Sequence, residues 1–433
     1  MSLLGQPRGS QPPGNWTSWI IWGTAAVFYL YEFFVRVAPS VMQEPLMEVM
    51  HVNAAGFGLA MGVYYYVYSP LQLVAGTLLD RYGARLVLLP SVLVVATGCL
   101  LEALGQNMVG VAMARGLQGL GSAFAFVGAM YLAAQWFPHG RLALIAGLTT
   151  ALGMAGGIMG NAGLEWLIEV EGWRATLHFS WIAGAVVFFL MLAVIPAAPP
   201  WAAAAEQENP EAPPPVSLLG AIFKVLRNPQ TLIIGLIGGI LYLPLTVVGG
   251  LWGESYITAV SPMSPQGASN AVSMLYVGWL AGAPLAGWLS DRVRKRRLFL
   301  VTSTVLTLVT TLFLTSFTAL HPATMFGLLL VVGLASSMQV VTFVSAIEAN
   351  DPLLHGTALS ANNMMVMLIG GLAQPLFGWI LDWSAGGLGV GDSYTAEHYR
   401  TAMILLPAAA LIGVIASFFL KESFRHHEGP VGH

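Results

Sequence analysis

Long apolar runs recur along the whole chain, each close to the roughly 20 residues that an α-helix needs to cross a hydrocarbon core. Because lipid offers the backbone no hydrogen-bond partners, each run predicts a membrane-spanning helix, and the short polar stretches between the runs predict loops. We therefore expect an all-α integral membrane protein. The pattern gives twelve spans, which we place near 17–42, 54–79, 85–104, 108–135, 141–168, 174–195, 229–258, 267–290, 297–318, 322–347, 356–382 and 400–420.

The twelve predicted spans form two sets of six, separated by a polar stretch that is rich in Pro, Ala and Glu. Near the end of that stretch, apolar residues recur at helical spacing over 218–226, which predicts a short helix lying on the membrane surface. The predicted organisation is a tail (1–16), a six-helix bundle (17–196), a linker with the surface helix (197–228), a second six-helix bundle (229–420) and a tail (421–433).

The two halves share an internal repeat. The stretch GTLLDRYGAR at 76–85 follows the second span, and GWLSDRVRKR at 287–296 follows the eighth span. Both halves therefore carry the pattern G-x-x-x-D-R at the same place. Parallel six-helix repeats are a transporter plan in which the substrate site lies near the midplane, where the two halves meet.

Composition excludes most other classes of protein. The chain is 56% hydrophobic and 9% charged, whereas soluble domains carry about 25% charged residues. The net charge of −3 argues against a nucleic-acid partner, and the single cysteine, Cys99, excludes an internal disulfide or a cysteine metal cluster. The sequence contains no nucleotide-binding lysine loop, catalytic triad or metal-ligand pattern. We therefore expect no enzyme, no cofactor and no metal, and a monomer that works with a small-molecule substrate, protons and the lipid bilayer.

The basic residues predict the orientation of the chain. Of the 17 Lys and Arg residues, Arg36 and Arg115 fall inside spans, and Arg174 and Arg400 fall in loops on one side of the membrane. The remaining 13 (17 − 4) fall in the tails, the linker and the loops of the other side. Because positive charge marks the cytoplasmic side of a membrane protein, we expect both termini to be cytoplasmic.

Four short motifs resemble one family. GTLLDRYGAR is similar to the loop motif G-x-x-x-D-R-x-G-x-R of the major facilitator superfamily of secondary transporters, and ARGLQGLGSA at 114–123 resembles its fourth-helix motif. WFPHGR at 136–141 and GWR at 172–174 resemble the stretches before its fifth and sixth helices. The resemblance covers essentially the whole chain, and it implies two pseudo-symmetric six-helix bundles, alternating access and residence in a bacterial inner membrane.

The same resemblance gives the repeated loop the role of a conformational latch that stabilises the outward-open state. Its glycines allow close helix packing and a tight turn, and its aspartate can pair with an arginine or with a neighbouring helix end. A static turn with solvated charges is the alternative. The latch candidates are Gly76, Asp80, Arg81, Gly83, Arg85, Asp291 and Arg292.

Glu32 and Arg36 lie inside the first apolar run, in the stretch YLYEFFVRVAPS at 29–40. At a rise of about 1.5 Å per residue, Glu32 lies roughly 20 Å into the span and Arg36 about 6 Å further. They share a helix face with Tyr29. A lone charge at the middle of a bilayer costs about 3 kcal/mol, so we expect the pair to face an aqueous cavity or each other.

Two interpretations of this pair stay open. In the first, it is a structural ion pair that locks the first helix. In the second, Arg36 binds an anionic group of the substrate through its planar fork, and Glu32 exchanges a proton to couple transport to a proton gradient. Arg36 also resembles the first-helix arginine of organic-anion and organophosphate members of the superfamily. The seventh span lacks the second arginine of the phosphate antiporters, which argues against phosphate esters.

Other polar residues inside the spans are candidates for lining the same cavity. Tyr64, Tyr68 and Gln72 are four apart and share a face, although an aromatic belt at the membrane surface is the alternative for the tyrosines. The resemblance gives the fourth-helix arginine a role in proton coupling or in bracing its helix. Helix–helix hydrogen bonding is the alternative for the asparagines. The remaining candidates are Tyr65, Arg115, Gln118, Trp252, Asn362 and Asn363.

The sequence thus predicts a proton-coupled transporter that imports a small anionic or zwitterionic organic solute by alternating access. A carboxylate, an amino acid or dipeptide, and a small iron-chelating metabolite all fit this description. One alternative is export of amphipathic compounds or a siderophore by proton antiport, against which the glycine-rich stretch at 153–160 counts, since it lacks the proline of the family's antiporter signature. The other alternative is a transporter-like protein that senses a ligand.

Overall fold

The computed structural model describes residues 14–138, 141–197, 218–316, 320–387 and 394–423, and no strand occurs among them. The elements of the first half are α1 (Trp16–Val37), η1 (Ala38–Val41), α2 (Gln43–Met50), α3 (Ala54–Leu104), α4 (Met108–Ser122), α5 (Ala125–Trp136), α6 (Leu142–Ile158), η3 (Met159–Gly163), α7 (Leu164–Glu171) and α8 (Trp173–Val194).

The second half begins with a short helix that precedes its bundle. Its elements are α10 (Leu218–Leu226), α11 (Pro229–Leu243), η4 (Pro244–Trp252), α12 (Gly253–Val260), α13 (Pro265–Val293), α14 (Arg296–Ser316), α15 (Pro322–Ser337), η5 (Met338–Val340), α16 (Val341–Glu348), η6 (Pro352–Leu354), α17 (His355–Ser384), α18 (Ala396–Met403) and α19 (Leu405–Phe418).

Eleven segments of the described chain are long and apolar enough to cross a membrane. One of them, α3, contains both the second and the third predicted span, so the eleven segments account for all twelve (11 + 1). The two parts of α3 meet at Gly83, whose φ of 77° and ψ of 159° suit glycine, because a side chain would clash there. The prediction of an all-α protein with twelve spans is confirmed.

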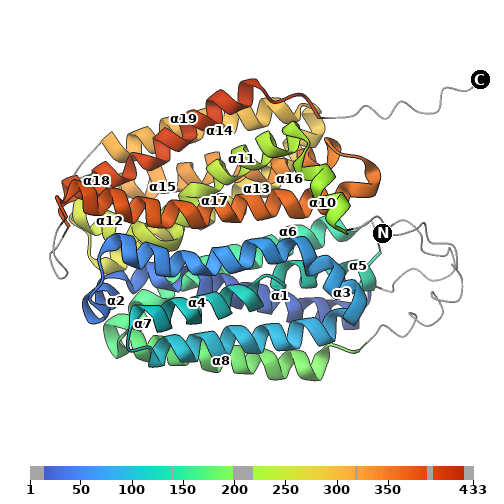
Figure 1. Cartoon of the computed structure of the whole chain (residues 1–433), viewed down its shortest axis with the longest axis horizontal. Helices are drawn as coiled ribbons and strands as arrows, with labels where there is room; N and C mark the ends of the chain where they lie inside the picture. The colour runs from blue at the N-terminus through green and yellow to red at the C-terminus, as the bar shows by residue number, and fades with distance from the viewer. Residues whose placement is uncertain (1–13, 139–140, 198–217, 317–319, 388–393, 424–433) are drawn as a thin grey trace, which may run out of the picture.

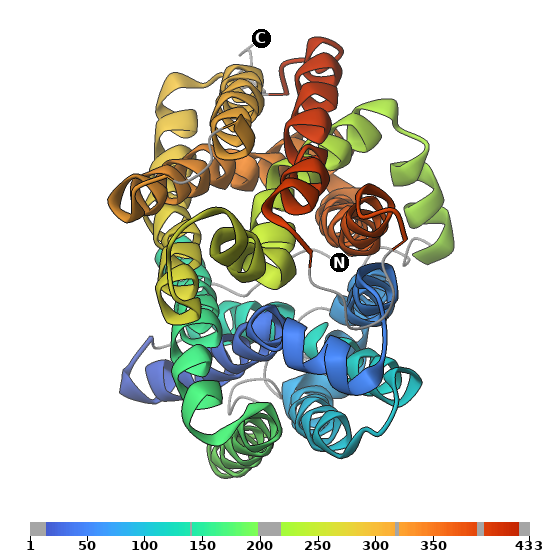
Figure 2. The ribbon, with the colours of Figure 1, turned by 90° about the vertical axis from the view of Figure 1, so that its left-hand side faces the viewer.

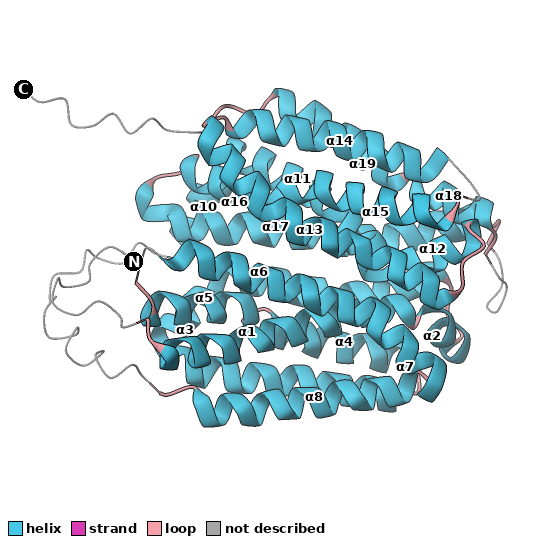
Figure 3. Cartoon of the chain, turned by 180° about the vertical axis from the view of Figure 1, so that it is seen from behind, coloured by secondary structure: helices cyan, strands magenta, loops and turns pink. Residues whose placement is uncertain are grey.

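The helices form two bundles that lie side by side. In Figure 1 the first half, α1 to α8, occupies the lower part of the view, and the second half, α11 to α19, occupies the upper part. Figure 2 looks along the helices and shows the same division, and Figure 3 shows it from behind. We call the end of the molecule where the described residues begin and end, and where α10 lies, the terminal end. We call the opposite end, where α2, α7, α12 and α18 lie, the far end.

The two bundles meet along a seam where α3 packs on α17 and α6 packs on α13. Glycine makes both contacts close. A Cβ at Gly58 of α3 would lie 2.7 Å from the carbonyl oxygen of Gln374, and a Cβ at Gly157 of α6 would lie 2.5 Å from the ring of Tyr276. The seam is therefore a tight helix–helix interface at these positions.

A helix occupies the stretch for which we predicted one, α10, at the terminal end, and its position on a membrane surface stays a prediction. Ala221 and Val225 are buried against α17, whereas Leu219 and Phe223 are 77% and 66% exposed on the outside of the molecule. One set of apolar residues of α10 thus packs on the protein, and the other set is exposed on the outer surface of the molecule.

Candidate functional site

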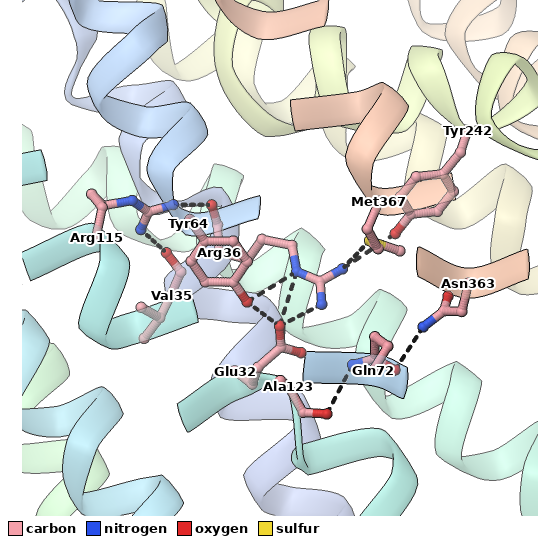
Figure 4. Close-up of polar contacts among 10 residues, drawn as sticks. All are labelled: Glu32, Val35, Arg36, Tyr64, Gln72, Arg115, Ala123, Tyr242, Asn363 and Met367. Atoms are coloured by element: carbon pink, nitrogen blue, oxygen red, sulfur yellow. Dashed lines mark hydrogen bonds and ion pairs between the residues drawn. The ribbon is translucent and has the colours of Figure 1, made fainter. Parts of the chain in front are cut away.

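Glu32 and Arg36 form an ion pair on α1, as their spacing predicts. Arg36 Nη2 lies 2.5 Å from Glu32 Oε1, and Arg36 Nε donates to the same oxygen at 2.9 Å. The hydroxyl of Tyr64 also donates to Glu32 Oε1 (Figure 4). Glu32 Oε2 has no hydrogen-bond partner among the described residues. The carboxylate is therefore held on one oxygen, and its other oxygen is buried without a donor.

The ion pair is buried at the seam, and side chains of both halves contact it. Glu32 is 0% and Arg36 is 3% exposed. From the second half, the hydroxyl of Tyr242 on α11 accepts a hydrogen bond from Arg36 Nη1 at 3.4 Å, and the sulfur of Met367 on α17 lies 3.9 Å from that nitrogen (Figure 4). Of the two arrangements that the sequence allowed, a cavity or mutual pairing, the structure has the second. Side chains pack around the pair.

Aromatic rings surround the Arg36 guanidinium. Its carbon lies 4.5 Å from the ring centroid of Phe33 and 5.1 Å from that of Tyr68. Tyr64 stacks on Tyr68, and Tyr65 packs edge-on against Tyr64. These three tyrosines are at most 3% exposed, so they form no aromatic belt at the membrane surface. The rings exclude water and hold the cation through their negative faces.

Tyr29 also lies near the seam, and it is 9% exposed. Its ring packs edge-on against Phe33 and lies close to Gly153 of α6, where a Cβ would come within 2.5 Å of it. The glycine therefore makes room for this tyrosine. The structure brings Tyr29 to the aromatic surroundings of Arg36, on the helix face that the sequence predicted.

Arg115 and Gln118 lie behind α1, on α4. Arg115 donates to the carbonyl oxygens of Val35 and Arg36, both at 3.1 Å, and to Gln118 Oε1 at 2.5 Å. The amide of Gln118 in turn donates to Glu102 at 2.6 Å. Arg115 thus contacts the backbone of the ion-pair residue, and bracing is the part of its expected role that this geometry matches.

The polar candidates of α3 and α17 make two different kinds of contact. Gln72 joins the halves, since its amide donates to the Ala123 carbonyl at 2.8 Å and its oxygen accepts from Asn363 at 2.9 Å. Asn362 donates to Thr342 at 3.2 Å, which is helix–helix hydrogen bonding within the second half. This contact matches the alternative of helix–helix hydrogen bonding, and a cavity-lining role for Asn362 stays a prediction.

Trp252 is fully buried, and the structure does not bring it to the ion pair through any hydrogen bond or ring contact of the described residues. Its indole N–H donates to the Gln374 carbonyl at 3.2 Å. Its ring stacks on Phe377 and meets Phe57 edge-on. Trp252 thus packs across the seam in this structure, and its role in binding substrate stays a prediction.

The two copies of the repeated loop differ. In the first copy, Asp80 forms no hydrogen bond or ion pair with the described residues, and Arg85 donates to the Ile195 carbonyl. In the second copy, Asp291 pairs with Arg296 at 2.6 Å, and Arg296 also pairs with Glu348 at 3.1 Å. Asp80 is thus without an ion pair among the described residues, whereas its counterpart Asp291 has one, and the role of a latch stays a prediction.

The other latch candidates have local contacts. Arg81 and Arg292 lie over the neighbouring rings of Tyr82 and Trp288. A Cβ at Gly76 would meet no atom within 4 Å, apart from its own helix backbone and chain neighbours. The close packing that we expected at Gly76 is therefore absent, because the helix faces open space at that point.

Polar contacts close the seam at the far end, and sequence reasoning did not find them. Asp382, at the end of α17, accepts from the backbone N–H groups of Ala54 at 3.2 Å and Ala55 at 2.8 Å, where α3 begins. Tyr394 donates to Asp382 at 2.5 Å. Burial raises the pKa of the Tyr394 phenol, and the hydrogen bond to Asp382 raises it further, so the phenol stays protonated and can donate.

Gln43 adds a second cross-seam contact at the far end. Its oxygen accepts from Ser255 at 2.8 Å, and its nitrogen donates to Tyr399 at 3.1 Å. Nearer the centre, Tyr66 of α3 donates to the Gly371 carbonyl of α17 at 3.0 Å.

Sequence reasoning missed two residues that contact the ion pair and one buried acid that lies behind it. Tyr242 and Met367 stand in apolar spans of the second half, where only the tertiary fold places them next to Arg36. Glu102 is an acid near the end of the third span and is 1% exposed. Its signal was present in the sequence, since an acid in an apolar run calls for a buried partner.

Comparison with known proteins supports the same fold. The family model of the Major Facilitator Superfamily matches residues 21–280 and 242–432. A crystal structure of a bacterial homolog to the human lysosomal transporter Spinster, inward-facing and unoccupied, superposes with a TM-score of 0.78 at 16% identity, over 97% of this chain and 100% of that one.

Curated relatives match over shorter stretches. The uncharacterized transporter YybO of Bacillus subtilis is 28% identical over 40% of this chain and 39% of its own length. The probable sulfoacetate transporter SauU of Cupriavidus necator is 23% identical over 36% and 37%, and the galacturonate transporter of Dickeya chrysanthemi is 23% identical over 36% and 45%. The aligned stretch thus spans less than half the length of these relatives. On its motifs, its two-bundle fold and the family match, the chain belongs to the Major Facilitator Superfamily.

Proposed function

We propose that this protein is a secondary transporter that takes up a small organic anion together with protons. The observation that carries the proposal is the Glu32–Arg36 pair, which is buried at the seam and contacted from both halves. A site that both halves complete is what alternating access requires, because each half then carries part of the substrate's contacts.

The proposed exchange uses the chemistry of the pair. A substrate carboxylate takes the place of Glu32 on the Arg36 fork, which suits planar anions with two acceptor oxygens. Glu32 then loses its counter-charge in a buried position, where an isolated carboxylate is costly, and it takes up a proton. Release of the substrate reverses both steps. Substrate and proton thereby move together.

The surroundings of Arg36 narrow the substrate class. The hydroxyl groups of Tyr64 and Tyr242 lie within hydrogen-bond reach of the guanidinium, so they can also meet the hydroxyl groups of a bound acid. Two relatives bear the names of a galacturonate and a sulfoacetate transporter, and both named compounds carry a carboxylate. A hydroxylated carboxylic acid, such as a sugar acid, is therefore our preferred substrate. We place the terminal end in the bacterial cytoplasm, following the basic residues.

Uptake into proteoliposomes tests this function. The purified protein should accumulate radiolabelled galacturonate or glucuronate when the outside is acid, and a proton ionophore should abolish the accumulation. Arg36→Ala should reduce uptake more than a hundredfold, because the anion loses its cation. Glu32→Gln should abolish accumulation driven by the pH gradient but keep substrate exchange across the membrane, since the neutral amide cannot release a proton. Arg174→Ala, at an exposed arginine, is the control.

The same assay separates the alternatives. The aromatic rings around Arg36 also suit an amphipathic compound, which an exporter would expel by proton antiport. In that case, loading the vesicles with such a compound should drive proton entry, and Arg36→Ala should leave that flux intact. Binding without flux of any tested acid would instead indicate a ligand sensor. If the double variant Glu32→Gln/Arg36→Ala transports like the wild type, the pair is structural.

A further inference from the structure

The last turn of α1 needs hydrogen-bond donors from outside the helix. Pro39 has no N–H, so the carbonyl of Val35, four residues earlier, cannot receive its usual helical hydrogen bond. The chain tightens into the turn Ala38–Val41 at this point. Arg115 supplies the missing donor to Val35 and a further one to the carbonyl of Arg36, both at 3.1 Å. Arg115 therefore fixes the backbone that carries the Arg36 side chain (Figure 4).

Arg115 is a buried cation without a carboxylate in contact. It is 2% exposed, and no ion pair joins it to an acid of the described residues. Besides the two carbonyls it contacts Gln118 and, at 4.9 Å, the ring of Tyr64. Glu32 is already bound by Arg36 and Tyr64. A buried guanidinium without a counter-charge is strongly unfavourable, so a further acid is needed to balance Arg115.

Glu102 is the acid that can balance Arg115, and Gln118 connects the two. Its Oε2 accepts from Gln118 at 2.6 Å, and its Oε1 has no hydrogen-bond partner among the described residues. The only hydrogen bond that ties the carboxylate to the described structure therefore comes from Gln118. Because the amide of Gln118 turns its nitrogen toward Glu102, its oxygen faces Arg115 and accepts at 2.5 Å. Rotating the amide would place its donor against the donor of Arg115.

We propose that Glu102 is a positioning residue for Arg36: it balances the charge of Arg115 through Gln118, and Arg115 in turn holds the α1 backbone. The four groups form one chain from the third span to the ion pair. Glu102 touches neither Arg36 nor Glu32 by a hydrogen bond, so its effect on substrate is indirect. The transport part of this inference rests on the proposed function, whereas the charge balance does not.

A stability cycle tests the charge balance without any substrate. The purified variants Glu102→Gln, Arg115→Gln and their double variant are melted in detergent. Glu102→Gln keeps the hydrogen-bond acceptor for Gln118 but removes the charge, so it should lower the melting temperature by at least about 3 °C. In the Arg115→Gln background the same change should leave the melting temperature unchanged or raise it, because the second neutralisation removes an uncompensated charge. Equal losses in both backgrounds would overturn the proposal.

A transport readout tests the positioning of Arg36. With galacturonate as the probe, Glu102→Gln should raise KM about tenfold and change the maximal rate less than twofold, since binding is affected rather than the conformational cycle. It should add nothing in the Arg115→Gln background. Glu165→Gln, at an acid of the same half that is 5% exposed and outside this chain of contacts, is the matched control. An unchanged KM in Glu102→Gln would contradict positioning. If the wild type transports no sugar acid, the proposed function fails, and the stability cycle still decides whether Glu102 balances Arg115.

Discussion

The two ends of the seam are held together in different ways. At the far end, Asp382 binds the first backbone N–H groups of α3, and Gln43 bonds to Ser255 and Tyr399 of the other half. At the terminal end, Asp80 is unengaged, and the ion pair of Lys224 with Asp351 is exposed and lies within the second half and its linker. Specific, partly buried polar contacts thus close the far end, and we expect them to set the cost of opening there.

Adding a methyl group to the tightly packed seam at the far end should have the largest effect on the difference between the two ends. A Cβ at Gly378 would lie 2.3 Å from the Ala54 carbonyl oxygen, so Gly378→Ala should force α3 and α17 apart. Overpacking of this kind costs about 1–3 kcal/mol, which corresponds to roughly a tenfold to hundredfold shift toward an open far end. Double electron–electron resonance between spin labels at Glu48→Cys and Glu397→Cys, both exposed at this end, measures the open fraction.

Gly147→Ala is the matched control for this change, because a Cβ there would meet no atom within 4 Å outside its own helix turn. Its spin-label distances should equal those of the parent protein. A Gly378→Ala variant with the parent distances would show that the far end tolerates separation of the two helices without opening.

Removing the charge of Asp382 should have the next largest effect. Asp382→Asn keeps one acceptor oxygen but loses the attraction of a carboxylate for a helix N-terminus, about 0.3–1 kcal/mol and up to about 2 when partly buried. The open fraction at the far end should therefore rise about threefold to tenfold in the same spin-label measurement. Glu169→Gln, at an exposed acid of α7 at the same end, should leave it unchanged. If both variants raised the open fraction equally, the change in net charge would explain the rise, and the contact of Asp382 with the helix N-terminus would not.

The exposed pair at the terminal end should have the smallest effect. The side chains of Lys224 and Asp351 are 66% and 58% exposed, and such surface pairs contribute at most about 1 kcal/mol. Lys224→Ala should change the uptake rate by less than about twofold. The open fraction at the far end, measured with the same spin labels, should also change by less than about twofold. A larger change would mean that α10 controls opening, and the contrast between the two ends would be lost.

The local parts of this molecule could be predicted from the sequence, and the long-range parts could not. Span number follows from run length and lipid thickness, and the Glu32–Arg36 contact follows from the helical repeat, because the two residues are four apart. Gly83 was expected at a tight turn, and its backbone conformation agrees. In each case the physical cause acts within a few residues.

The partners that complete the site depend on the packing of distant segments. Tyr242 and Met367 reach Arg36 from 206 and 331 residues away. Asp382 binds Ala54 across 328 residues. Trp252 was a candidate for the substrate site, and in the structure it packs between Phe57 and Phe377, as a large aromatic side chain can. Without the relative placement of the two halves, the sequence could not separate these roles.

The hydrogen bonds between α3 and α17 follow each other along the seam in antiparallel order. Ala54 and Ala55 meet Asp382, Tyr66 meets Gly371, and Gln72 meets Asn363. When two helices that are bonded at successive levels tilt apart, the hydrogen bonds break in sequence from one end. Opening of the far end would break the Asp382 contacts first and the Gln72 contact last, so it would pass through states in which the two helices are separated at the far end and still bonded near Gln72. The order in which these hydrogen bonds break would then determine the end from which the ion pair first becomes accessible.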